Sequence, residues 1–77
     1  MEKTKYYIHL FDYEIGSAIF ESGFFDSKEE ALEFAKCCNF LVSNSVNVEL
    51  MYANFYNDDC EYVAFERSLE PGEYGRI

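Results

Sequence analysis

The first stretch of the chain with a clear hydrophobic pattern, residues 5–13, is apolar on both of its alternating sets of positions. Successive side chains of a β-strand point to opposite faces of the sheet. One face would carry Tyr6, Ile8 and Leu10, and the other would carry Tyr7, His9, Phe11 and Tyr13. A strand in a small sheet normally buries one face and leaves the other polar. The pattern therefore predicts a strand that needs a cover on each side.

The rest of the chain predicts three more strands and one helix. Residues 5–13 and 18–25 would form a hairpin around Gly16, and residues 46–56 and 60–67 would form another around a turn at 57–59. Between the hairpins, residues 26–41 show helical periodicity. Ser27 would be the N-cap, with Glu30 in the position of a capping box. We expect the helix to end at Asn39 or within 43–45.

This order, β-β-α-β-β, predicts an α+β fold in which a four-stranded antiparallel sheet carries one helix on one face. Residues 1–67 would form a single domain, and residues 68–77, which contain the only Pro, would form an irregular tail. The helix would turn a common apolar face toward the sheet, made of Ala31, Phe34, Ala35, Cys38, Leu41 and Val42. The sheet would meet it with Ile8, Leu10, Phe20, Val48 and Leu50.

The opposite face of the predicted sheet is apolar as well. It would carry Tyr7, His9, Phe11, Tyr13, Ile19 or Phe25, Met51, Phe55, Val63 and Phe65. A patch of this kind on a small domain usually marks a contact surface. Four covers are open at this point: the tail through Leu69, Tyr74 and Ile77, a second copy, a different protein, or stacked nucleic-acid bases.

Charge narrows these choices. The chain has 15 Asp and Glu against six Lys and Arg, for a net charge of −9. Residues 6–27 and 37–66 hold acidic residues but no Lys or Arg. Direct nucleic-acid binding is disfavoured because it rests largely on basic side chains that neutralise phosphates. The same charge attracts basic protein surfaces. The plainer alternative is that it serves only solubility.

No motif indicates an enzyme, a cofactor or a metal site. Cys37, Cys38 and Cys60 are odd in number, and with His9 they lack the ligand spacing of a zinc site. His9 has no positioned nucleophile beside it, so we expect no catalytic residue. The poor disulfide framework, the missing apolar signal core and the lack of a membrane-spanning run together predict a cytoplasmic protein.

The sequence therefore predicts a small acidic, non-enzymatic interaction protein that binds a basic surface. In size and charge, though in no motif, it resembles phage and mobile-element inhibitors of nucleic-acid-handling host enzymes, including DNA mimics. The acidic contacts would come from Asp12, Glu14, Glu21, Asp26, Glu49, Asp58, Asp59, Glu61 and Glu66. The aromatic contacts, to a partner or a second copy, would come from Tyr7, His9, Phe11, Tyr13, Met51 and Phe55. The alternatives are a regulatory domain that binds single-stranded nucleic acid on its aromatic face, and a homodimeric adaptor.

Overall fold

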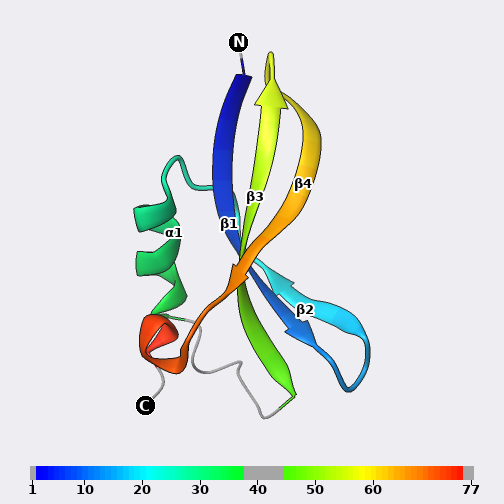
Figure 1. Cartoon of the computed structure of the whole chain (residues 1–77), viewed down its shortest axis with the longest axis vertical. Coiled ribbons are helices and arrows are strands. Elements are labelled where there is room, and N and C mark those ends of the chain that lie inside the picture. The colour runs from blue at the N-terminus through cyan, green and yellow to red at the C-terminus, as the bar shows by residue number, and fades with distance from the viewer. Residues whose placement is uncertain (1, 38–44, 76–77) are drawn as a thin grey trace.

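The computed structural model describes residues 2–37 and 45–75. Its elements are β1 (Glu2–Asp12), β2 (Ser17–Glu21), α1 (Lys28–Ala35), β3 (Val46–Tyr56), β4 (Asp59–Ser68) and a short 3₁₀ helix, η2 (Pro71–Tyr74). The strands form one antiparallel sheet in the order β2-β1-β3-β4, and α1 packs on β1 and β3 from one side (Figure 1). The predicted β-β-α-β-β order and the antiparallel sheet with one helix are confirmed.

The central pair of strands sets which residues share a face. β1 and β3 are in register along their whole length, with Ile8 opposite Leu50 and His9 opposite Glu49. Ile8 and Leu50 point toward α1, and both are completely buried. Their neighbours His9 and Glu49 therefore point to the other side, which we call the open face because α1 does not cover it.

The helix begins where the sequence predicts. The Ser27 hydroxyl accepts a hydrogen bond from the Glu30 backbone N–H at 3.2 Å, and donates one to the Glu30 carboxylate at 3.3 Å. The first of these bonds satisfies one of the backbone donors that the first helical turn leaves unpaired. The helix ends at Ala35, earlier than expected. The predicted ends at Asn39 and 43–44 lie outside the described residues, as do Cys38, Leu41 and Val42.

The core lies between α1 and the sheet. Its buried side chains are Ile8, Leu10, Ala31, Ala35, Val46, Val48, Leu50, Leu69 and Tyr74. Phe34 of α1 completes it by stacking on Phe20, with ring centroids 6.2 Å apart, and by packing against Phe25 at 5.4 Å. Phe25 is therefore on the helix side, and its expected alternative place on the open face is wrong. The alternation of the second hairpin strand breaks because β2 ends at Glu21, and Phe25 rejoins β1 only through a bridge to Tyr6.

The segment after β4 is ordered differently from the irregular tail that the sequence predicts. Ser68 still belongs to β4, and η2 follows it with Leu69 and Tyr74 buried in the helix-side core. Cover of the open face by Leu69 and Tyr74 is therefore ruled out, and Ile77 lies outside the described residues. Two hydrogen bonds from the Arg67 guanidinium to the Glu73 carboxylate, at 2.8 and 2.7 Å, fasten η2 to β4.

The turns follow their predicted chemistry. Asn57 and Asp58, between β3 and β4, both have positive φ, at 52° and 69°. A two-residue hairpin with both central residues in this region matches the right-handed twist of the strands. Gly16 also has a positive φ, 72°, in the turn between β1 and β2. Throughout the part of the chain that the structure describes, no helix has the length and apolar character to cross a bilayer.

Candidate functional site

The open face carries a continuous row of rings, which we call the aromatic ladder. It consists of Phe55, Phe24, Tyr7, His9, Phe11 and Tyr13. Successive ring centroids lie 5.0, 5.4, 6.5, 5.9 and 4.7 Å apart, and most of the pairs meet edge to face. Edge-to-face packing is a favoured geometry for aromatic pairs. Tyr7, His9 and Phe11, at odd positions of β1, supply half of the ladder, and Tyr13 follows directly after the strand. This accounts for the apolar second face of β1.

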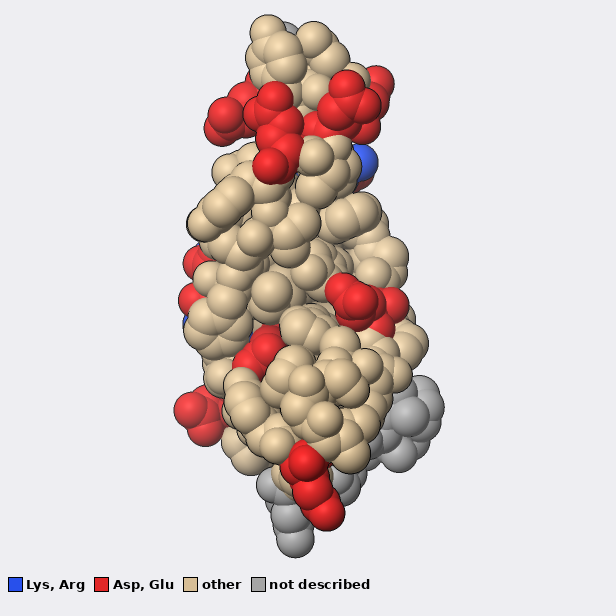
Figure 2. Space-filling view, turned by 90° about the vertical axis from the view of Figure 1, so that its right-hand side faces the viewer, with Lys and Arg blue, Asp and Glu red and all other residues tan. Residues whose placement is uncertain are grey.

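Strand pairing places further apolar side chains beside the ladder. Met51 lies opposite Tyr7 in the register of β1 and β3, and Val63 and Phe65 of β4 lie next to Ala53 and Met51. Phe65 is 53% exposed and Phe24 is 49% exposed, whereas Tyr7 is buried by its neighbours. Figure 2 views the molecule from the side away from α1, where a broad and mostly uncharged surface, broken by a few acidic side chains, covers the middle of the sheet. The aromatic residues predicted for this face are thus together on it.

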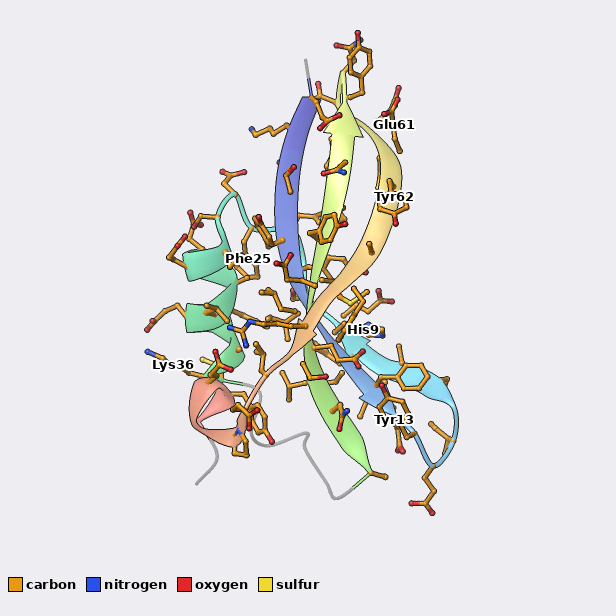
Figure 3. All side chains as sticks on the ribbon, in the orientation of Figure 1. His9, Tyr13, Phe25, Lys36, Glu61 and Tyr62 are labelled. Carbon is orange, nitrogen blue, oxygen red and sulfur yellow. The ribbon has the colours of Figure 1, made fainter. Side chains whose placement is uncertain are left out.

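A buried carboxylate interrupts this apolar surface. Glu49, only 6% exposed, accepts a hydrogen bond at Oε2 from the Tyr13 hydroxyl at 2.9 Å. Its Oε1 lies 3.7 Å from Nδ1 of His9, which is too long for a hydrogen bond. Nδ1 itself is buried and makes no hydrogen bond with the described residues. Figure 3 shows His9 and Tyr13 on the side of the sheet away from α1.

The hydrogen bond also affects the titration of Tyr13. Its pKa is raised above 10.0, first because the phenol donates to Glu49 and then by desolvation and the charge of that carboxylate. The phenol is the donor in this bond, and the Glu49 carboxylate is the acceptor. Burial, with a smaller contribution from Glu21, likewise raises the pKa of Tyr7.

A shallow pocket opens over this carboxylate. It has a volume of about 340 Å³ and is lined by His9, Phe11, Tyr13, Glu49 and Phe65. Its walls are mainly rings and its polar groups are a carboxylate, a phenol and an imidazole. We call it the Glu49 pocket. Such a site can accept a hydrogen-bond donor or a cation between aromatic surfaces.

The nine acidic residues singled out from the sequence separate into two groups. Four are engaged with the fold: Glu49 in the pocket, Asp12 as acceptor for the Glu14 N–H, Asp26 paired with Lys5, and Glu66 paired with Lys28. The other five form no ion pair with the described residues, and we call them the rim carboxylates: Glu14, Glu21, Asp58, Asp59 and Glu61. They belong to the β1–β2 turn, the end of β2 and the β3–β4 hairpin. Figure 2 shows acidic side chains gathered at one end of the uncharged surface and singly elsewhere around it.

Basic side chains contribute little to the open face. Lys5 lies 5.8 Å from the centroid of the Phe55 ring and 3.6 Å from Asp26. With Lys3 and Phe55 it lines a second hollow, of about 540 Å³, near the β3–β4 turn. Lys28, Lys36 and Arg67 each pair with a carboxylate elsewhere, at 3.3, 3.1 and 2.7 Å.

The described residues do not form a metal site, and their cysteines are not placed beside His9. Across residues 2–37 and 45–75, no three or more His, Cys, Asp or Glu side chains are grouped so as to hold a metal ion. Cys37 and Cys60 are exposed free thiols. Cys60 is separated from His9 because β3 lies between β1 and β4. The fourth zinc candidate, Cys38, lies outside the described residues.

Two features of the site were not apparent from the sequence. Phe24 joins the ladder although Gly23 breaks the alternation before it, so counting from β2 could not assign its face. The sequence suggests that Glu49 is exposed to solvent, but it is buried in contact with His9 of β1 and with Tyr13, which follows β1. The only available signal was that Glu49 stands between the core residues Val48 and Leu50.

Comparison of the chain with family models, with curated proteins and with solved structures finds no match.

Proposed function

We propose that this protein is a non-enzymatic interaction domain that binds a protein partner through its open face. The partner would meet the aromatic ladder with an apolar patch and the rim carboxylates with basic side chains. The observation that carries this proposal is the continuous, partly exposed aromatic ladder, flanked by carboxylates that form no ion pair in the described chain. Interfaces are enriched in aromatic residues and Met at the centre, with a polar rim.

Charge favours a basic protein over the other occupants. Two copies packed face to face would bring two sets of rim carboxylates together, at a net charge of −9 each. Single-stranded nucleic acid could stack on the ladder, but stacking platforms normally lie in a positively charged groove. On this face Lys3 and Lys5 lie at one end only, and Lys5 already pairs with Asp26.

Basic surfaces are most extensive on proteins that handle nucleic acids. An inhibitor or modulator of such an enzyme is therefore the role that we propose for the chain. The rim carboxylates stand at the ends and sides of an apolar centre rather than in an even row. This arrangement supports an interface with a hydrophobic anchor more than an imitation of phosphate spacing.

The test uses two matched variants of β4. Phe65 and Tyr62 are similarly exposed aromatic residues, but Phe65 is on the open face and Tyr62 packs near Tyr52 on the opposite one. Wild-type, Phe65→Ser and Tyr62→Ser proteins would be used as baits in nuclease-treated bacterial extract. A protein retained by wild type would then be purified and its Kd measured by calorimetry at two salt concentrations.

The proposal expects Phe65→Ser to weaken that Kd by about tenfold or more, and Tyr62→Ser to leave it within about twofold. It also expects affinity to fall as salt rises, because the rim charges are exposed. Equal losses in both variants would contradict the use of the open face. A wild-type dimer in light scattering that Phe65→Ser converts to a monomer would instead assign the face to self-association, and tight binding of an oligonucleotide would assign it to nucleic acid.

A further inference from the structure

We infer that the Glu49 pocket receives the guanidinium of one arginine side chain of the partner. This inference rests on the proposed function and deepens it, because it names the group that would anchor the complex. The site differs from the rim carboxylates in that its carboxylate is buried, ordered by a neighbour and placed among rings.

The first argument is the unused capacity of the Glu49 carboxylate. An ionised carboxylate has about four acceptor positions. Among the described residues, Glu49 receives one hydrogen bond, from Tyr13 to Oε2, and its Oε1 has only the long 3.7 Å contact with His9. No Lys or Arg side chain of the described chain pairs with it. A buried carboxylate so poorly compensated gains most from a cationic donor.

The second argument is access. Glu49 lines the pocket together with Phe11, Tyr13 and Phe65, so its carboxylate can be approached from the open face. A ligand group that enters the pocket loses its hydrating water and contacts the carboxylate among apolar rings. An ion pair is stronger in such surroundings than in bulk water.

The third argument selects arginine. A guanidinium is planar, stacks on aromatic faces and donates two parallel hydrogen bonds to a carboxylate. The pocket offers rings as walls and a carboxylate whose Oε1 accepts no hydrogen bond from the described residues. A lysine ammonium is a compact, strongly hydrated charge, and it stacks on aromatic rings less well than a guanidinium does. A phosphate or carboxylate ligand would be repelled by Glu49. A purely apolar group would leave Oε1 without a donor.

The test uses short peptides, so it does not require the partner. Acetyl-Gly-Arg-Gly-amide would be titrated into isotopically labelled full-length protein and followed by NMR, beside matched peptides with lysine or with citrulline, the uncharged analogue of arginine. We expect saturable shift changes at His9, Phe11, Tyr13, Glu49 and Phe65 with the arginine peptide. The lysine peptide should bind more weakly, and the citrulline peptide should produce no saturable change.

Glu49→Gln keeps the size of the side chain and removes its charge, and it should weaken the arginine peptide by about tenfold or more. Glu61→Gln makes the same charge change on the rim, far from His9 and Tyr13 in Figure 3, and should change the affinity by less than about twofold. If Glu49→Gln does not fold, Phe65→Ala removes a wall at an exposed position, with Tyr62→Ala as its match. Phe65→Ala should weaken binding of the arginine peptide, and Tyr62→Ala should leave it unchanged.

The outcomes separate this inference from the proposed function. Equal binding of the arginine and citrulline peptides, or equal loss in Glu49→Gln and Glu61→Gln, would overturn the assignment of the pocket. If the pocket fails this test while Phe65→Ser still releases the partner, the interaction face stands without its arginine anchor. If the pocket binds the arginine peptide but Phe65→Ser retains every captured protein, the proposed function fails by itself.

Discussion

The two faces of the sheet are built from the same strands, but one face is covered by other elements and the other is not. On the helix side, Ile8, Leu10 and Leu50 have no exposed surface, because α1, η2 and Leu69 close over them. On the open face, the rings of the ladder contact one another while Phe24 and Phe65 stay about half exposed. The helix-side face forms the core, whereas the open face leaves apolar surface exposed. Hydrophobic content alone therefore does not identify a core, because a core also needs a second element that covers it.

Truncation of one residue on each face should show the largest difference. Leu50→Ala should lower the free energy of unfolding by about 2–5 kcal/mol, because it leaves a cavity under α1. Phe65→Ala should cost less than about 1 kcal/mol, because the ring is 53% exposed. Urea denaturation of both variants measures the difference. An equal cost would mean that the open face belongs to the core.

The docking of η2 on the helix side can be tested at a glycine. Gly75 has φ 79°, and a Cβ there would lie 2.7 Å from the Lys36 carbonyl oxygen. Gly75→Ala should therefore cost more than the ~1–2 kcal/mol of a left-handed alanine. Gly16→Ala is the control, since Gly16 has φ 72° but nothing within 4 Å of the added carbon. Thermal denaturation that shows no excess cost in Gly75→Ala would argue against this close approach of η2 and α1.

Acid should weaken the attachment of η2 to β4 on the helix side. The Arg67 guanidinium, with the Glu70 backbone, lowers the pKa of Glu73 to about 2 from 4.5. Because the folded pKa is the lower one, this pair contributes stability above pH 4.5 and loses it as the pH falls toward 2. The groups are partly exposed, so the loss should stay below about 1 kcal/mol. Glu73→Gln should flatten this part of the stability curve, and an unchanged curve would contradict the role of the pair.

The smallest effect is a titration on the open face. The pKa of Tyr13 is raised chiefly by its hydrogen bond to Glu49. Glu49→Gln should therefore return that pKa toward 10.0, as followed by the NMR shift of the Tyr13 ring carbon. Asp59→Asn, which makes the same charge change at the distant β3–β4 turn, should leave it in place. If the Tyr13 pKa is the same in Glu49→Gln as in the wild type, the hydrogen bond between Tyr13 and Glu49 is absent in solution.

Much of the fold could be predicted because the local signals agree. The third strand has the bounds expected from its alternation, Val46–Tyr56, and Ser27 caps the helix as its spacing indicates. The placement of Phe25 failed where Gly23 interrupts the alternation. The tail was misjudged because its Pro and Gly suggest irregular chain. Its order depends on a capping box between Glu70 and Glu73 and on the distant Arg67.

The site could be predicted only as a face. Alternation in β1 and β3 was enough to bring Tyr7, His9 and Phe11 to one side with Met51. The burial of Glu49 depends on the register between those strands and on the orientation of Tyr13, and neither is encoded in a short window of sequence. The separation of the rim carboxylates from the paired ones depends likewise on where Lys5 and Lys28 reach.

The pairing of β1 with β3 also has a consequence for how the chain reaches its native state. It sets Glu2 opposite Tyr56 and Asp12 opposite Val46, contacts between residues that are far apart in the sequence. Such contacts slow folding, because a long loop must close before they form. During synthesis β1 and β2 leave the ribosome well before β3, with the apolar side chains of both faces uncovered and prone to aggregation. Residues 1–45 already hold eight acidic side chains against four Lys, and this excess disfavours contact between such incomplete copies.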